Sequence, residues 1–311
     1  MFVYLLFFFE PYSTNSKQQM KYLNIKTNKQ MKKIFSLITA LLLTTTWVGA
    51  AEKPTLNIAT FNIRMDTPSD GVNQWSNRKE MVKDLIQYHD FDIIGTQEGF
   101  VHQLKEITTL SNYAYVGVGR EDGIEAGEHS AIVYKKDRFK VLDKGDFWLS
   151  ETPDVPGKGW DANCCNRLCS WAKFKDLKSK KTFYLFNVHY DHEGKVARYQ
   201  SSLLMLRKMK EIAGDAPFFC TGDFNATPNQ EPIQVLLNSQ WLLDSKALSK
   251  AKPYGTTGTY HAYKADAEMK DRIDYIFVPQ SVKILKYGVI NDIQYGRFPS
   301  DHFPVMVKAT L

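Results

Sequence analysis

The sequence predicts a mixed α/β fold built in layers, with more strands than helices. Ten short stretches rich in β-branched and aromatic residues are bounded by Gly, Asp, Asn or Pro, which is the pattern of strands between turns. Stretches with helical spacing of apolar residues lie between some of them, so we expect strands packed sheet on sheet with helices outside. Residues 52–311 contain no repeat, low-complexity tract or linker. About 260 residues can bury roughly 70–75% of their unfolded surface, which predicts a single domain.

The predicted strands run through the whole of this domain. They cover residues 55–62, 91–96, 113–118, 130–135, 139–147, 170–176, 182–190, 217–221, 271–278 and 304–309. The segment KFKDLKSKKTF at 173–183 contains five lysines between two of these strands. We expect a solvated hairpin tip there rather than a nucleic-acid contact.

Two amphipathic helices are predicted between strands. In the first, Asn77 followed by Glu80 resembles a capping box, and the apolar positions then recur at helical spacing, at Met81, Leu85 and Tyr88. In the second, ended by a glycine at 214, one face is predicted to consist of Val196, Tyr199, Leu203 and Leu206.

Residues 31–51 have the three-part pattern of a secretory signal. Lys32 and Lys33 form the basic start, an apolar run follows, and small residues predict cleavage near Ala50 or Ala51. A start at Met31 would give an ordinary exported protein, so residues 1–51 are interpreted as a leader. The alternative is a buried N-terminal helix. We therefore predict a secreted protein, periplasmic or extracellular.

The net charge of +6 is concentrated in this leader. Residues 1–51 hold six lysines and one acid, which leaves 34 basic and 33 acidic residues in the remainder. A nearly neutral domain lacks the broad positive field that holds phosphate backbones without sequence preference. Charge therefore argues against a general nucleic-acid-binding protein.

Polar side chains lie at an end of, or within, six predicted strands. They are Asn62, Gln97, Glu98, His189, Asp191, His192, Asp223, Asn225, Asp274, Asp301 and His302. One such residue is usually a turn former, but six coincident strand ends favour a shared site. Asp274 lies inside an apolar strand, where a carboxylate requires a partner, and we predict His302 for that role.

Carboxylates, amides and histidines without Cys-x-x-Cys or His-x-x-x-His spacing favour a hard cation over zinc. We predict Mg²⁺, with Mn²⁺ or Ca²⁺ as alternatives. A cation held by one or two carboxylates with open water positions is typical of phosphate chemistry.

The motifs TGDFN at 221–225, IDY at 273–275 and SDHFPV at 300–305 occur in an order that resembles the endonuclease/exonuclease/phosphatase superfamily. The resemblance extends over residues 55–309. It implies a four-layer α/β sandwich of the DNase I type, in which two packed mixed β-sheets are flanked by helices. It also implies that residues 52–311 are one catalytic domain with its site at one edge of the sheets.

The same resemblance implies a role for each site residue. His302, held by Asp274, would be general base or transition-state stabiliser, Asp223 would orient water, and His189 would donate to the phosphate. The implied metal ligands are Glu98, Asn62 and Asp301. The implied phosphate or substrate contacts are Asn225, Arg167, Arg120 and Asp191.

We therefore predict a metal-dependent phosphoric ester hydrolase that cleaves a phosphodiester, or a phosphomonoester, by in-line attack of water. Its substrate would be a phosphorylated small molecule, a lipid headgroup or a nucleic acid. A secreted nuclease is the main alternative. A non-catalytic binding module and a glycosidase using Glu98 and Asp223 are the others. We expect a monomer without a stable protein partner.

The loop at 147–167 is rich in Pro, Gly and Trp and lies next to a cysteine cluster. Long loops beside a site often select the substrate. Trp160 would either stack on a substrate or pack the loop onto the core. One disulfide among Cys164, Cys165 and Cys169 is compatible with export.

Overall fold

The computed structural model describes residues 15–44 and 54–311, and the chain divides into two units, 1–52 and 53–311. In the first unit, helix α1 runs over Asn15–Thr44, and the side chains of residues 18–36 are exposed. Among the described residues, no helix combines the length and apolar character that a membrane span needs. The predicted cleavage site lies outside the described residues.

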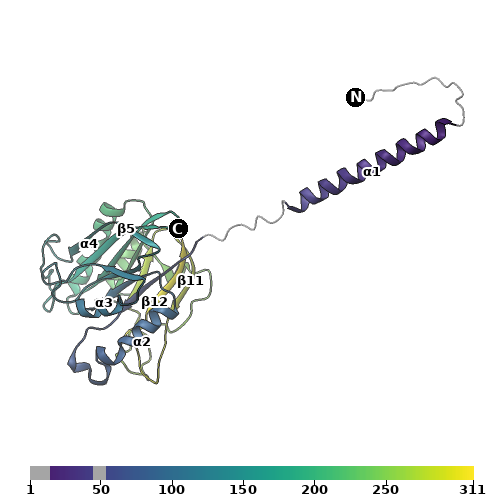
Figure 1. The fold of residues 1–311 in the computed structure, drawn as a ribbon. Coiled ribbons are helices and arrows are strands. Elements are labelled where there is room, and N and C mark those ends of the chain that lie inside the picture. The colour runs from purple at the N-terminus through teal and green to yellow at the C-terminus, as the bar shows by residue number, and fades with distance from the viewer. Residues whose placement is uncertain (1–14, 45–53) are drawn as a thin grey trace. The chain divides into compact units, whose positions relative to one another are not determined.

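Two six-stranded mixed sheets form the centre of the second unit (Figure 1). The first sheet has the order β11-β12-β1-β2-β4-β3, with bounds Lys283–Val289, Val305–Thr310, Leu56–Asn62, Ile93–Gln97, Ile132–Lys135 and Tyr113–Val116. The second has the order β5-β6-β7-β8-β10-β9, with bounds Phe139–Trp148, Leu168–Asp176, Thr182–His189, Phe218–Asp223, Asp274–Val278 and Leu243–Asp244.

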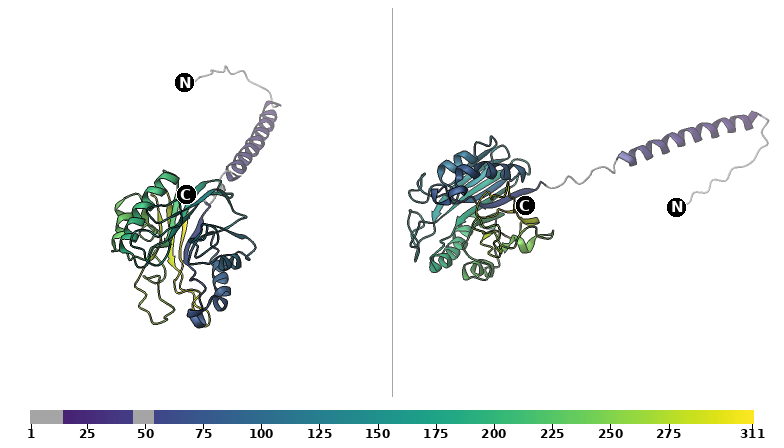
Figure 2. Two further views of the ribbon diagram at one scale, coloured as in Figure 1. Left: turned by 90° about the vertical axis from the view of Figure 1, so that its left-hand side faces the viewer. Right: turned by 90° about the horizontal axis from the view of Figure 1, so that it is seen from below.

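The helices lie on the two outer faces, as the two views of Figure 2 show. Those that follow the first strands are η1, a short 3₁₀ helix, with α2 and α3, at Pro68–Asn73, Trp75–Tyr88 and Val101–Ile107. Those of the second half are α4 and α5, at Lys195–Ala213 and Glu231–Asn238. The short helix α6, Ser245–Leu248, instead contacts β10 and β11, which are strands of different sheets.

Three buried apolar clusters hold these layers together. One fills the space between the sheets, with members such as Ile58, Ile93 and Phe219. The second packs α2 and α3 onto the first sheet, and the third packs α4 and α5 onto the second. Burial of apolar surface on both faces of each sheet is the main stabilising term of such a fold. The predicted four-layer sandwich is confirmed.

A buried polar network joins the two sheets. Gln97 of β2 donates to the side-chain oxygen of Asn187 on β7 at 2.8 Å, and Asn187 donates back to the Thr96 carbonyl at 2.8 Å. Thr221 of β8 donates to the same Asn187 oxygen at 3.0 Å. The sheets approach so closely here that a Cβ on Gly95 would overlap Asn187 and Thr221. The sequence had placed Gln97 with the strand-end polar residues, but it belongs to this network.

Several predicted element details are wrong. Helix α2 begins at Trp75 without a side-chain cap, and Asn77 instead donates to the Val72 carbonyl, so the predicted capping box does not form. Tyr88, predicted on the apolar face, is exposed.

In α4 the buried face is also different from the predicted one. Val196 and Leu203 are exposed, and the buried residues include Arg198, Ser202, Leu204, Met205 and Met209. Arg198 and Ser202 are covered because they hydrogen bond to the carbonyls of Asp191 and Pro232. The predicted end of this helix at Gly214 is confirmed.

Strand β11, Lys283–Val289, was missed because two lysines interrupt its apolar pattern. It nevertheless pairs along its length with β12.

Candidate functional site

The register of the second sheet brings three site residues into one row. His189 at the end of β7 lies opposite Asp223 on β8, and Asp223 lies opposite Asp274 on β10. Residues opposite one another on neighbouring strands have adjacent side chains. Strand pairing therefore places one imidazole and two carboxylates at one edge of the sheet.

His302 completes this row from the loop before β12. Its Nδ1 lies 2.9 Å from Oδ2 of Asp274, in the pair that the sequence predicts. Its Nε2 lies 3.8 Å from Oδ2 of Asp223. All three side chains are buried. The buried Asp274 carboxylate fixes which nitrogen of the ring faces Asp223, as in other His–Asp pairs.

Asn62 connects Asp223 to Glu98. Its Nδ2 donates to Oε1 of Glu98 at 2.9 Å and to Oδ2 of Asp223 at 3.1 Å. Glu98 also accepts the backbone N–H of Met65 at 3.1 Å and lies 3.6 Å from the guanidinium of Arg64. Two carboxylates that come from different sheets thus share one amide.

The charges of this cluster follow from its burial and contacts. Burial lowers the pKa of His302, but the charge and hydrogen bond of Asp274, with the charge of Asp223, outweigh it and raise the pKa to about 10. Burial and the charge of Asp274 raise the pKa of Asp223 to about 7. Burial opposes ionisation of Glu98, yet the Asn62 hydrogen bond and the charge of His302 hold its pKa below the usual value. Near neutral pH the cluster therefore has an imidazolium and an ionised Glu98.

Three residues of the site have left-handed backbone conformations. The φ angles of Arg64, Glu98 and Asn225 are 56°, 65° and 46°. Such angles are uncommon outside glycine, and in a bulky residue the surroundings must hold them. Asn225 is held by its backbone N–H to Oδ1 of Asp223 at 2.9 Å and by its Nδ2 to the Tyr190 carbonyl at 2.9 Å.

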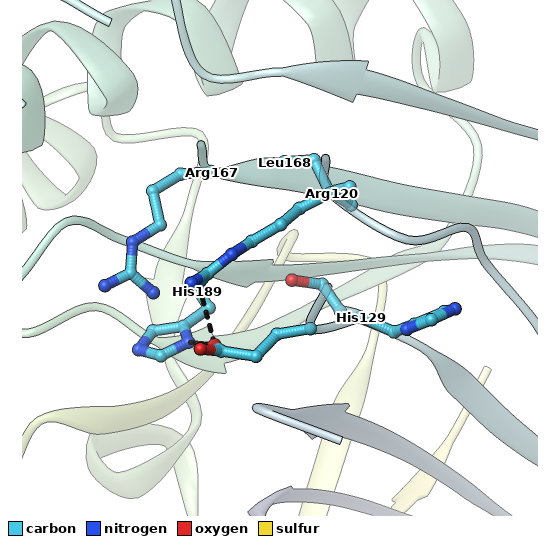
Figure 3. Close-up of a pocket in the computed structure, with 7 residues that line it drawn as sticks. Arg120, His129, Arg167, Leu168 and His189 are labelled. Atoms are coloured by element: carbon cyan, nitrogen blue, oxygen red, sulfur yellow. Dashed lines mark hydrogen bonds and ion pairs between the residues drawn. The ribbon is translucent and has the colours of Figure 1, made fainter. Parts of the chain in front are cut away.

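The cluster opens into a cavity of about 680 Å³. The wall residues from the predicted site are Glu98, Asp223, Asn225, Asp301, His302, His189, Arg120 and Arg167. Figure 3 shows Arg120, Arg167 and His189 converging at one end of it, while the ring of His129 points away. Burial and the charge of Arg167 place the pKa of His189 well below its ordinary value, so this imidazole is neutral.

A model of the endonuclease/exonuclease/phosphatase family matches residues 59–302. The chain belongs to this family. The crystal structure of a family protein from Bacteroides thetaiotaomicron has 43% identity and a TM-score of 0.80, covering 83% of this chain and 98% of that one. A mannosyl-6-phosphatase of Bacteroides thetaiotaomicron VPI-5482 has 42% identity and a TM-score of 0.79, covering 82% of this chain and all of the other.

More distant relatives match this chain over only part of their length. An uncharacterized protein of Acanthamoeba polyphaga mimivirus is 30% identical over 168 residues, and Nocturnin of Drosophila melanogaster is 25% identical over 276. The chain spans about 62% and 41% of these two curated relatives. Family membership and the chemistry of the site support phosphoester hydrolysis over the glycosidase alternative.

The donor set of the site fits a divalent cation. Glu98, Asp223 and Asp301 are carboxylates that border the same cavity, and hard oxygen ligands of this kind are those that Mg²⁺ and related ions prefer. Asp223, Asp274 and His302 also offer ligand atoms within 4.8 Å of one another, and Oδ1 of the buried Asp274 has no hydrogen-bond partner. Glu98 and Asp301 are the carboxylates that could hold a cation without disturbing the His302–Asp274 pair.

Three residues of the predicted site are engaged with protein partners. Oδ1 of Asn62 accepts the backbone N–H of Arg64 at 3.0 Å. Arg120 donates from Nη1 to Glu128 at 2.7 Å and from Nε to Glu121 at 3.1 Å, and its remaining N–H groups are free of these two contacts.

Asp191 is the third, and it does not border the cavity. Its Oδ1 accepts the N–H groups of Glu193 and Gly194, at the start of α4, at 2.9 and 2.6 Å. Its Oδ2 lies 3.7 Å from Nε of Arg167. In this arrangement Asp191 supports Arg167 from behind the cavity wall.

Sequence reasoning missed Arg64, Glu128 and Tyr260, which also line the cavity. Arg64 follows a strand end that was recognised, and only its ion pairs with Asp70 at 2.8 Å and Glu98 reveal its place. Glu128 lies before strand β4, and no polar motif at a strand end includes it. Tyr260 lies in a long loop without periodicity, and its ring centre is 4.9 Å from that of His302.

The loop at 147–167 forms one rim of the cavity. Trp160 packs against the apolar cluster of the second sheet, which favours the core interpretation of this residue. Cys164 and Cys165 line the cavity and form the disulfide pair, whereas Cys169 is buried and free.

Proposed function

We propose that this chain is a divalent-metal-dependent phosphomonoesterase that acts on a sugar phosphate. The observation that carries the proposal is the 42% identity to a mannosyl-6-phosphatase over the whole of that protein. The polar cavity beside the His302–Asp274 pair is compatible with a small hydroxylated substrate. The sequence alone favoured a diester, and the relative moves the preference to a monoester.

In the proposed reaction, water attacks phosphorus in line, the P–O bond to the sugar breaks, and inorganic phosphate and the free alcohol leave. Asp223 orients the water and accepts its proton, because its pKa lies near 7, and that proton then passes to the departing sugar oxygen. The His302 imidazolium and the free N–H of Asn225 stabilise the charge on the phosphoryl oxygens. A cation held by Glu98 and Asp301 would supply further positive charge at those oxygens when bound.

The test compares mannose 6-phosphate, p-nitrophenyl phosphate, bis(p-nitrophenyl) phosphate and plasmid DNA. We expect hydrolysis of both monoesters, much slower diester cleavage, loss of activity in EDTA and recovery with excess Mg²⁺, Mn²⁺ or Ca²⁺. Faster cleavage of DNA than of monoesters would support the nuclease alternative. If no ester is hydrolysed but mannose 6-phosphate still binds, the result would support the non-catalytic binding module.

We also propose that the protein is secreted, on the basis of the signal pattern at residues 31–51. N-terminal sequencing of the protein recovered from periplasm or medium should give a start at Ala51 or Glu52. Recovery of the full leader on mature protein would contradict export by this signal.

A further inference from the structure

The cavity continues beyond His189 to a second group of polar residues. We call this group the distal end and define it as Arg120, Glu128, Arg167 and His192. On one side of the His189 ring, Nε2 lies 3.6 Å from Oδ2 of Asp223, and on the other, Nδ1 lies 3.8 Å from Oε2 of Glu128. The distal end is therefore separated by about one imidazole width from Asp223, which the proposed function places at the attacking water. That separation suits the alcohol portion of a phosphate ester.

Arg167 has donors that nothing in the described structure satisfies. The residue is only 5% exposed, and its Nε and Nη1 have no hydrogen-bond partner. Its Nη2 lies 2.9 Å from Nδ1 of His192, and its nearest carboxylate contact is the 3.7 Å approach of Asp191. Unsatisfied buried donors are costly, so groups of this kind in a cavity wall indicate a ligand.

The chemistry at this end is mixed. Glu128 offers an acceptor and Arg167 offers donors, and both border the cavity of about 680 Å³ as well as a small pocket that shares residues with it. A phosphate oxygen can only accept hydrogen bonds near neutral pH, and a carboxylate beside it would repel it. A hydroxyl group both donates and accepts, so it can bind between a carboxylate and a guanidinium. The pattern therefore matches hydroxyl groups better than a second phosphate.

We propose that Glu128 and Arg167 bind hydroxyl groups of the ester's alcohol, which makes the distal end the specificity determinant for polyhydroxylated alcohols. The inference rests on the proposed function and deepens it. Glu128 accepts from one hydroxyl, and the free N–H groups of Arg167 donate to the same or the neighbouring one. Arg120 holds Glu128 in place through the 2.7 Å hydrogen bond.

The alternative role for Glu128 is purely structural, as the ion-pair partner of Arg120. The chain offers a matched control, because Glu121 pairs with the same arginine at 3.1 Å but does not line the cavity, and its side chain is 45% exposed. Loss of either carboxylate leaves Arg120 with the other. A merely structural role would therefore give similar effects for the two glutamates.

The experiment measures kcat/KM for mannose 6-phosphate and for p-nitrophenyl phosphate, which has no hydroxyl group, in wild type, E128Q and E121Q. Burial raises the pKa of Glu128 to about 7, so the assay is run at pH 8, where the carboxylate is mostly ionised. We expect the ratio of sugar to aryl ester to fall roughly 10- to 100-fold in E128Q, the size expected for lost hydrogen bonds to a charged group. The ratio should stay at the wild-type value in E121Q. An unchanged ratio in E128Q, or an equal change in both variants, would overturn the inference.

Binding of free mannose separates this inference from the proposed function. Wild type should bind the sugar in a titration followed by ligand-observed NMR, and E128Q should bind it at least about 10-fold more weakly. If no ester is hydrolysed yet sugar binding depends on Glu128, the proposed function fails and the distal end is still a hydroxyl site. If esters are hydrolysed but sugar binding is equal in E128Q and E121Q, the inference fails alone.

Discussion

The two ends of the cavity are built differently. At the catalytic end, defined here as Asp223, Asp274, His302 and Asn62, strand register aligns Asp223 with Asp274, and side-chain hydrogen bonds connect His302 to Asp274 and Asn62 to Asp223. At the distal end, Arg120 and Glu128 lie in the loop between β3 and β4, and Arg167 immediately precedes β6. The donors of Arg167 are left partly unsatisfied.

We infer from this difference that the catalytic end carries out the reaction and the distal end recognises the alcohol. A site fixed by strand register keeps its geometry because a shift would disturb the whole sheet. Loops on such a scaffold can change without loss of the core. We expect changes at the catalytic end to act on kcat for every ester, and changes at the distal end to act on KM and on substrate choice.

The largest effect should come from His302→Ala. Loss of the imidazolium should reduce kcat about 1,000-fold for sugar and aryl esters alike, within the range of acid–base and charge-stabilising groups. Steady-state kinetics on both esters, with circular dichroism as a check of folding, measures this.

The matched control is His102→Ala. His102 forms a His–Asp pair with Asp66 at the same 2.9 Å as the catalytic pair, but its side chain is 49% exposed and does not line the cavity. Its loss should leave both rates at the wild-type level. Wild-type rates in the His302 variant, or selective loss for one ester, would contradict the division between the two ends.

A smaller effect, of a different kind, is expected from Arg167→Lys. Lysine keeps the charge but loses the planar fork, so KM for mannose 6-phosphate should rise about 10-fold while kcat changes much less. Initial rates over a wide substrate range separate the two parameters. A fall in kcat with constant KM would place Arg167 at the phosphate, as the sequence predicted, rather than at the alcohol.

The smallest effect concerns the support behind the catalytic end. His261 is stacked at 4.2 Å against Phe298 and against Phe303, both of its ring nitrogens lack partners, and burial lowers its pKa to about 4. As the pH falls, the unfolded chain protonates this histidine near pH 6.5, whereas the folded chain protonates it only near pH 4. Stability contributed by the neutral ring is therefore present above that pH and lost as the pH falls toward about 4.

Thermal unfolding of wild type and His261→Phe from pH 7.5 to 4 tests this sign. The melting temperature of the variant should fall less steeply than that of wild type below pH 6.5. Parallel curves for the two proteins would show that His261 does not titrate in this way. The variant should keep wild-type activity at pH 7.5, because His261 does not line the cavity.

Much of the fold could be predicted because strand composition and turn residues are local properties. All ten predicted strands exist, with ends shifted by a few residues. The errors occurred where tertiary contacts override local pattern. Arg198 and Ser202 of α4 are buried because carbonyls of other segments accept their hydrogen bonds, and β11 is a strand because β12 lies beside it.

The sequence by itself determined the chemistry of this protein: the family, the layered fold and the carboxylates, amides and histidines of the catalytic end. The types of the side chains are given directly by the sequence, so motifs at strand ends are enough to predict which chemical groups the site contains. Only the tertiary structure decided which groups meet. Asn62 reaches Asp223 across 161 residues of chain, and Glu128 reaches Arg120 and His189 through a loop without a recognisable pattern. Such pairings depend on register, loop conformation and burial, which no single segment contains.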